Sequence, residues 1–233
     1  PLAKLTTIGH SLPMARVILA AFEGTQGLDV LGPGEVFGGV ARLLERPAYE
    51  VVVATVGGGP FRTTSGVVIG SVDLRALRPR ASDTVLVMGG ASRAVSAAVL
   101  DDALVAWLAR AARVVRRIAS VCAGTFVLAR AGILDGHRVA THWSACSRLA
   151  SFRPQLEVDA DAIFVHEGSV WTSAGVTTGI DMALAMVEED FGRHVVDSLA
   201  AWFVLYARRP GFQSQFSDAL VAQREAEGSI AAA

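Results

Sequence analysis

Cysteine is scarce in this sequence, in which Cys122 and Cys146 are the only two among 233 residues. Two cysteines with no secretion signal do not indicate a disulfide framework, and they are typical of a protein in the reducing cytoplasm. Long apolar runs are lacking as well. The run at residues 118–129 lies between Arg117 and Arg130, well short of the roughly 20 residues that cross a bilayer. We therefore expect a soluble, cytoplasmic protein with no membrane partner.

Neither sign of charge is in excess. The 21 basic and 22 acidic residues give a formal net charge of −1, and the arginines are scattered along the chain. Proteins that bind duplex DNA through its phosphates usually gather basic side chains on one surface. We therefore expect no DNA contact by this chain alone. The 52% of apolar residues can bury one sizeable core, which indicates a single α/β domain.

Residues 116–134 form the stretch on which the functional interpretation depends. An apolar, β-branched run ends at Cys122, the small residues Ala123 and Gly124 follow, and a helical pattern begins at once. This order is typical of a nucleophile elbow, a tight strand-to-helix turn that exposes one side chain at the carboxyl end of its strand. Because a helix N-terminus favours negative charge, we expect a lowered pKa for the Cys122 thiol. The alternative is that Cys122 is a small buried apolar residue.

Strand and helix patterns alternate along the rest of the chain. Continuous apolar runs indicate buried strands, and apolar residues at helical spacing indicate helices. Their alternation predicts a mainly parallel sheet with helices on both faces. The expected strands lie within residues 15–22, 49–56, 83–88, 114–121 and 133–140, with hairpins at 62–72 and 163–171, and the expected helices are 30–44, 101–112, 178–191 and 194–206.

Candidate ligand-binding groups follow three of these strands. In open α/β sheets, ligands bind outside the carboxyl ends of the strands, so Asp29, the Gly89-Gly90 pair and Cys122 are expected to converge. Cys122 would be the nucleophile, and the amides of Ala123 and of Gly89 or Gly90 would form an oxyanion-type cradle. Asp29 would face the thiol as an acid or base. The alternatives are a helix N-cap for Asp29 and a plain loop for the glycines.

His142 offers a further candidate, because an imidazole can accept a thiol proton. The alternative, which we favour, is a structural histidine between a strand and a helix. His142 and Cys146 are four residues apart and could share a metal, but two ligands make a weak site. We therefore expect neither a metal nor a cofactor. Asp181 lies at the start of a helix, where it is expected to cap the helix or to stabilise the helix dipole.

Four ordered motifs carry a family resemblance. Together they resemble the ThiJ/PfpI superfamily, which has a class I glutamine-amidotransferase-like fold, and most of all the N-terminal domain of GlxA-type, AraC-family transcriptional regulators. The resemblance covers residues 15–206, and residues 207–217 are similar to the segment that joins this domain to a helix-turn-helix pair. The motifs are LDVLGPGEVF at 28–37, VMGG at 87–90, SVCAGTFVLARAGILDGHRVATHW at 120–143 and TSAGVTTGIDMALAMVEE at 172–189.

The resemblance implies a flavodoxin-like three-layer sandwich, a homodimer, and a site with Cys122 at the elbow and Asp29 as its carboxylate partner. It also implies that residues 14–206 sense an unidentified small molecule. Residues 207–233 would be a linker or the start of a missing helix-turn-helix domain.

An enzyme of the same superfamily is the alternative that the resemblance leaves open. Isonitrile hydratases share the Asp29 and Cys122 positions but commonly carry a threonine where this chain has Ala123. Deglycase-like and peptidase-like members generally use a glutamate in place of the aspartate.

Overall fold

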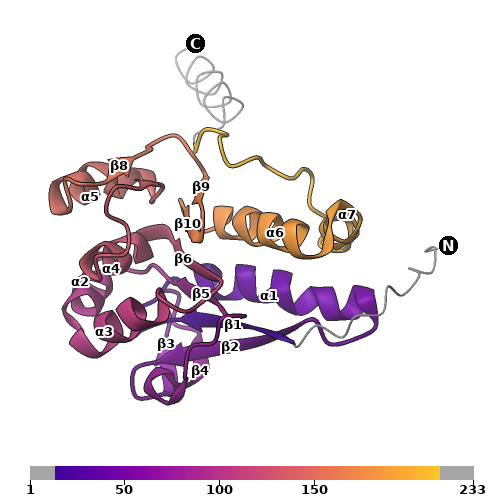
Figure 1. The fold of residues 1–233 in the computed structure, drawn as a ribbon, viewed down its shortest axis with the longest axis horizontal. Helices are drawn as coiled ribbons and strands as arrows, with labels where there is room; N and C mark the ends of the chain where they lie inside the picture. Colours follow the sequence, from indigo (N-terminus) through magenta and orange to yellow (C-terminus); the bar gives the residue numbers. More distant parts are fainter. Residues whose placement is uncertain (1–13, 216–233) are drawn as a thin grey trace, which may run out of the picture.

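The structure, a computed structural model, describes residues 14–215 and builds them around one eight-stranded sheet (Figure 1). Its strands are β1 (Ala15–Ala20), β2 (Tyr49–Thr55), β3 (Gly59–Arg62), β4 (Val68–Asp73), β5 (Thr84–Val87), β6 (Arg117–Val121), β9 (Phe164–Glu167) and β10 (Val170–Ser173). They lie in the order β3-β4-β2-β1-β5-β6-β10-β9. Pairing is parallel from β4 to β10 and antiparallel only at the edges, between β3 and β4 and between β9 and β10. The carboxyl ends of the parallel strands therefore share one edge.

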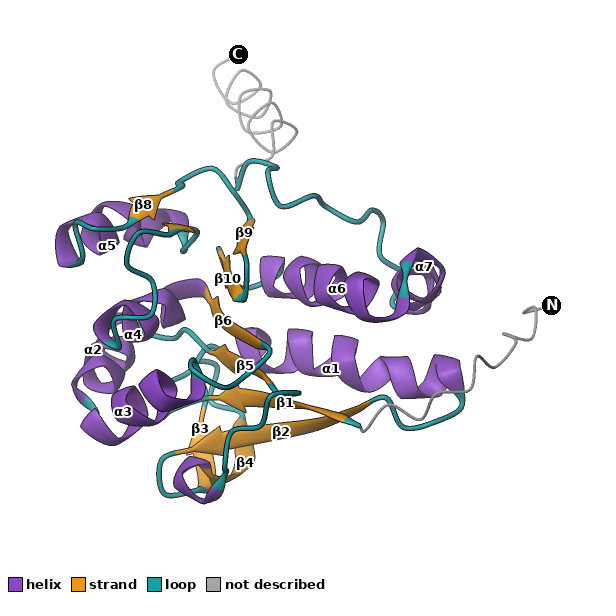
Figure 2. Cartoon of the chain, in the orientation of Figure 1, coloured by secondary structure: helices purple, strands orange, loops and turns teal. Residues whose placement is uncertain are grey.

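The sheet separates two apolar cores. In β1, Val17 and Leu19 belong to one core and Ile18 and Ala20 to the other, because successive side chains of a strand point to opposite faces. Figure 2 shows helices on both sides of the sheet, which confirms the predicted flavodoxin-like sandwich. The helices are α1 (Gly27–Leu44), α6 (Thr178–Phe191) and α7 (Arg193–Trp202) over the first core, and α2 (Ser92–Leu100), α3 (Asp102–Ala111) and α4 (Thr125–Arg130) over the second.

A smaller unit follows α4 in the chain. The two-residue strands β7 (Arg138–Val139) and β8 (Glu157–Val158) pair in parallel, and α5 (Cys146–Phe152) lies between them in sequence and contacts β8. The loop from β7 to α5 carries His142. Within the described part of the chain, no helix has both the length and the apolar character needed to cross a membrane.

Most of the predicted elements are confirmed, and the helix at 178–191 has the predicted bounds. The sequence prediction omitted α2, a short helix of nine residues in which only Val95 and Ala98 are buried. The closing helix ends at Trp202, four residues earlier than predicted, because Val204 adopts a φ of +54°, outside the helical region. Residues 216–233 of the predicted linker lie outside the described residues.

A buried charge cluster ties the starts of β2 and β6 to the end of α6. The Arg117 guanidinium donates to both carboxylate oxygens of Asp190, at 3.0 and 2.7 Å, and to Glu189 at 2.8 Å. The Tyr49 hydroxyl donates to Asp190, and Arg116, which is half exposed, also forms an ion pair with it. Burial acts to raise the pKa of Asp190, but the hydrogen bonds from Arg117 and Tyr49 hold it below its usual value.

Arg117→Met should lower the free energy of unfolding by about 3 kcal/mol, because it removes the main partner of a buried carboxylate. The matched control is Arg116→Met, which removes an exposed arginine from the same carboxylate and should cost about 1 kcal/mol or less. Urea unfolding followed by circular dichroism measures both values. Equal losses for the two variants would contradict the assignment of Arg117 as the main partner.

Candidate functional site

The predicted nucleophile elbow is confirmed. Strand β6 ends at Val121, and Cys122 takes a φ of +56° before a 3-10 turn leads into α4. A left-handed φ is uncommon for a residue other than glycine, and this conformation places a side chain at the top of its strand. Gly124 is required in the turn, because a Cβ there would lie 2.3 Å from the carbonyl oxygen of Val87. Close packing of β5 against the elbow therefore explains the glycine two residues after Cys122.

Asp29 is fully buried and is held by two loops. It lies in the first turn of α1, which begins at Gly27 after the N-cap Gln26, so the N-cap alternative for Asp29 is wrong. Its Oδ1 accepts a hydrogen bond from the Val176 amide at 2.8 Å, and its Oδ2 accepts one from the Gly89 amide at 3.2 Å. The carboxylate thus joins α1 to the loops that follow β5 and β10.

Gly89 lies between the carboxylate and the thiol. A Cβ on Gly89 would lie 2.7 Å from Cys122 Cβ, 2.7 Å from the Ala123 nitrogen and 2.9 Å from Asp29 Oδ2. These distances bring together the groups that were predicted to converge, and only glycine fits among them. The Gly89 amide donates to Asp29, so of the amides predicted for the oxyanion-type cradle those of Gly90 and Ala123 remain as candidates, and the cradle itself stays a prediction.

The thiol and the carboxylate titrate as a coupled pair. Burial raises the pKa of Asp29 to about 6, although the Val176 and Gly89 amides oppose the change. Burial also raises the pKa of Cys122 to about 12, the charge of Asp29 adds to the increase, and the Ala123 amide opposes it. The lowered thiol pKa predicted from the helix N-terminus is wrong, because burial outweighs the dipole of a six-residue helix. At neutral pH the pair holds one negative charge.

His142 lies in the same cavity as Cys122. Its Nδ1 faces the hydroxyl of Ser144 at 2.8 Å and the Ser144 amide at 3.4 Å, and burial lowers its pKa. Ser144, which the sequence analysis did not single out, orients the His142 ring through this contact. The Thr141 hydroxyl donates to the Cys122 carbonyl at 3.0 Å, which fixes this loop on the elbow. Cys146 is buried, and its thiol faces the carbonyl of His142 at 3.6 Å.

The cavity at the elbow has a volume of about 330 Å³, and Cys122, His142, Gly90 and Val176 lie in its wall. Val176 has a φ of +54°, which is strained for a β-branched residue. A Cβ on Gly175 would lie 2.1 Å from Cys122 Cβ. Residues 172–189 were identified as a family motif, but no site role was predicted for Gly175 or Val176. Among the described residues, no group of three or more His, Cys, Asp or Glu could hold a metal.

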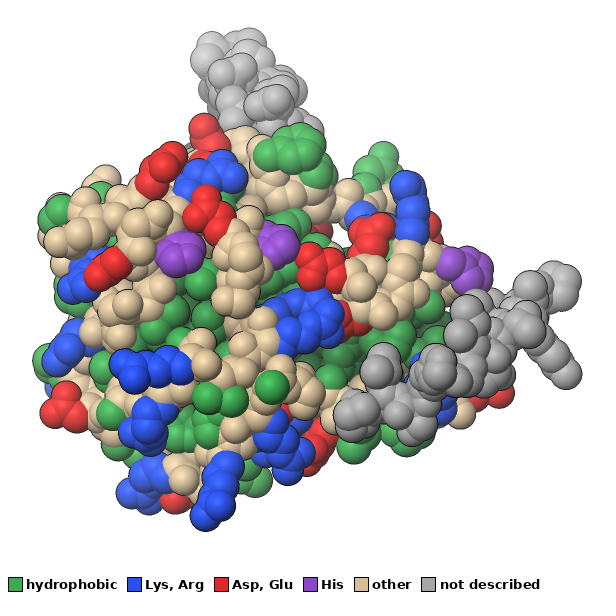
Figure 3. Space-filling model, in the orientation of Figure 1, with side chains coloured by type: hydrophobic (Ala, Val, Ile, Leu, Met, Phe, Trp, Pro, Cys, Tyr) green, Lys and Arg blue, Asp and Glu red, His purple; other side chains and the backbone are tan. Residues whose placement is uncertain are grey.

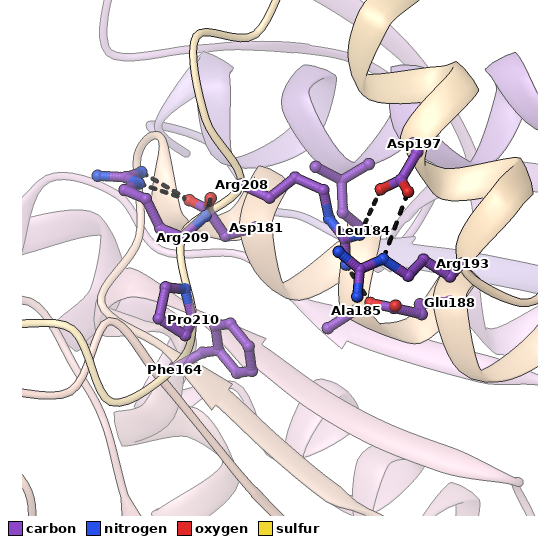
Figure 4. A pocket seen from close by; sticks show the side chains of 10 residues that line it. All are labelled: Phe164, Asp181, Leu184, Ala185, Glu188, Arg193, Asp197, Arg208, Arg209 and Pro210. Atoms are coloured by element: carbon purple, nitrogen blue, oxygen red, sulfur yellow. Dashed lines mark hydrogen bonds and ion pairs between the residues drawn. The ribbon is translucent and has the colours of Figure 1, made fainter.

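A larger cavity, of about 470 Å³, lies between α6, α7 and residues 208–210 (Figure 4). Its charged side chains neutralise one another: Arg209 pairs with Asp181 at 2.6 Å, and Arg208 pairs with Glu188 and with Asp197. Asp181 is in the first turn of α6 as predicted. It also forms the ion pair with Arg209, which was not predicted. Because its charges are internally paired, this cavity is a weaker candidate site than the elbow.

Comparison with protein families and curated proteins agrees with this geometry. Residues 15–189 match the DJ-1/PfpI family. The chain is 33% identical over 174 residues to the HTH-type transcriptional regulator CdhR of Pseudomonas aeruginosa, covering 73% of this chain and 49% of that protein. It is 32% identical over 162 residues to the HTH-type transcriptional regulator GlxA of Rhizobium meliloti, covering 70% and 49%. The chain thus spans about half the length of each regulator.

The chain is also 27% identical over 204 residues to an isonitrile hydratase of Pseudomonas putida, covering 84% of this chain and 81% of that protein. Among solved structures, a ThiJ/PfpI family protein from Pseudomonas syringae matches with a TM-score of 0.73 and 23% identity, over 90% and 85% of the two chains. An AraC family transcriptional regulator from Pseudomonas putida matches with a TM-score of 0.66 and 17% identity, over 81% and 99%. At these identities the two structures establish the fold alone.

Asp29→Asn should speed alkylation of Cys122 by iodoacetamide at pH 8, because removal of the neighbouring negative charge lowers the thiol pKa. A decrease of one pKa unit gives about tenfold more thiolate. The ratio of variant to wild-type rates should fall toward one below about pH 6, where Asp29 of the wild type takes up its proton. Mass spectrometry of the Cys122 peptide gives the rates, with Cys146 as the internal control. Slower labelling of the variant would instead place the proton on Asp29 beside a thiolate.

Proposed function

Because the chain belongs to the DJ-1/PfpI family, we propose that it is the small-molecule-sensing domain of an AraC-family transcriptional regulator. The similarity to CdhR and GlxA supports the regulator class. The ligand would occupy the elbow cavity beside Cys122, with the amides of Gly90 and Ala123 and the side chain of His142 in its wall. The observation that carries the proposal is the anchoring of residues 207–215 on two of the loops that contribute to the wall of this cavity, the loop that carries Val176 and the loop that carries His142.

The first anchor is Arg209. Its guanidinium donates to the Thr177 hydroxyl at 2.9 Å and to Asp181 at 2.6 Å. Thr177 follows Val176, whose amide holds Asp29. A ligand that moves the loop at 175–177 therefore moves a side chain that Arg209 holds directly.

The second anchor is Gln215. Its side-chain amide donates to the carbonyl of Thr141 at 3.0 Å, and the Thr141 hydroxyl in turn donates to the Cys122 carbonyl. The adjacent His142 lies in the cavity wall. Each of the two loops thus contacts the cavity on one side and residues 207–215 on the other, which suits the transfer of a binding signal to whatever follows.

DNA contact would come from a domain outside residues 14–215. The face drawn in Figure 3 carries both basic and acidic side chains rather than one sign of charge. We expect the protein to be cytoplasmic, as a transcriptional regulator would be. We also expect a homodimer, since Leu31 of α1 and Trp202 of α7 expose about half of their surface, and a two-fold dimer would present paired DNA-binding domains to two half-sites.

Hydration of an isonitrile is the second candidate function, and the Cys122–Asp29 pair favours it together with the similarity to an isonitrile hydratase. Ala123 removes the hydroxyl that such enzymes commonly carry at this position. Incubation with cyclohexyl isocyanide should therefore give no N-cyclohexylformamide, the product of adding one water, beyond the amount formed with Cys122→Ala. Gas chromatography measures the product. Formamide that depends on Cys122 would establish the enzyme instead.

Alkylation of Cys122 by iodoacetamide places a covalent occupant in the cavity and tests the sensing role. Amide hydrogen exchange in residues 207–215 should become faster, by about twofold or more, because the adduct displaces the anchoring loops. Arg209→Gln should reduce this response. Arg208→Gln is the matched control, since Arg208 binds Glu188 and Asp197 rather than a cavity loop, and it should keep the response. Exchange that is unchanged by alkylation of the wild type would refute the proposal.

A further inference from the structure

We propose that the elbow cavity takes a small molecule with an anionic end, such as a carboxylate, and that Arg148 is the residue that binds this end. The inference rests on the proposed function only in taking this cavity as the ligand site. Arg148 belongs to α5 and lies in the cavity wall with Cys122. No site prediction from the sequence included it.

The guanidinium of Arg148 is positioned for an external partner. Its central carbon lies 5.0 Å from the centre of the Phe126 ring, and stacking on an aromatic face restricts the orientation of the planar group. Among the described residues, no carboxylate pairs with Arg148, whereas the arginines beside the larger cavity, Arg208 and Arg209, are neutralised by acidic neighbours. The fork that binds carboxylates in two hydrogen bonds is therefore unused.

The charges around the cavity give the ligand a direction. Among the described residues that line the cavity, Arg148 is the one side chain charged at neutral pH, because the Cys122 thiol is protonated there, and Asp29 lies buried behind that thiol. Burial lowers the pKa of His142, so its imidazole is neutral at neutral pH. Arg148 attracts an anionic group, and the ionised Asp29, which is buried behind Cys122, repels it. The ligand should thus bind with its anionic end at Arg148 and an uncharged or positively charged end toward Cys122.

A second part of the cavity wall, the start of α2, also attracts anions. Helix α2 begins there at Ser92, its N-cap Ala91 provides no side-chain acceptor, and the first amides of a helix carry partial positive charge. The volume of about 330 Å³ corresponds to a ligand of roughly ten non-hydrogen atoms, at about 30 Å³ for each water-sized atom. A short aliphatic carboxylate fits this size and charge.

The test compares two reagents of similar size that attack the same sulfur. Iodoacetate carries a carboxylate and iodoacetamide is neutral, and each forms a carbon–sulfur bond with Cys122 and releases iodide and, from the thiol, a proton. Arg148→Gln should lower the ratio of the iodoacetate rate to the iodoacetamide rate by about three- to tenfold at low salt. Arg148→Lys should restore part of the ratio. The matched control is Arg113→Gln, which removes an exposed charge after α3 and should leave the ratio unchanged.

A second measurement does not depend on thiol reactivity. Sodium propionate, compared with sodium chloride at equal ionic strength, should raise the Tm of the wild type and of Arg113→Gln but not of Arg148→Gln. An unchanged rate ratio in Arg148→Gln, or the same Tm in both salts for the wild type, would overturn the assignment. These outcomes are separate from the exchange response of residues 207–215, which tests the sensing role alone.

Discussion

The candidate site depends on one buried carboxylate that joins three segments of the chain. Asp29 belongs to α1, and its carboxylate accepts hydrogen bonds from the backbone amides of Gly89 and Val176. Burial raises its pKa from 3.8 to about 6, so the protonated form favours folding below about pH 4, and this contribution is lost as the pH rises through 6. Two pKa units correspond to about 3 kcal/mol. The fold keeps an ionised group that lowers its stability at neutral pH, as proteins do where a site needs a charge.

Backbone contacts hold the geometry around this carboxylate. A Cβ would collide with neighbouring atoms at Gly89, Gly124 and Gly175, at distances of 2.1 to 2.7 Å, so the strand-end loops approach more closely than side chains allow. Cys122 and Val176 both have left-handed φ angles, a strain that persists only where the surroundings determine the conformation. The thiol is thus placed by the sheet and by three glycines.

The sequence was sufficient to predict the sheet, the elbow and the proximity of Asp29 to Cys122. Buried parallel strands give continuous apolar runs, and their carboxyl ends share one edge of the sheet. The sequence was not sufficient for the partners of these groups. The contacts from Val176 to Asp29 and from Gln215 to Thr141 join residues far apart in the chain, and no local pattern encodes them. The predicted direction of the shift in the Cys122 pKa was wrong for the same reason. The start of a helix can be recognised from local sequence, whereas the burial that raises the pKa depends on the whole fold.

The charges of Cys122 and Asp29 help to decide whether the cavity only binds a ligand or also converts it. A thiol whose pKa is about 12 is almost wholly protonated at neutral pH, and the thiolate is the form that attacks carbon. Catalysis would require a base, such as the ionised Asp29, or the substrate itself to take the proton from sulfur, whereas binding requires only shape and charge. The loops that enclose the thiol are the ones that Arg209 and Gln215 hold from outside. A largely protonated thiol, in a cavity whose loops Arg209 and Gln215 also hold, is consistent with the proposed sensing role.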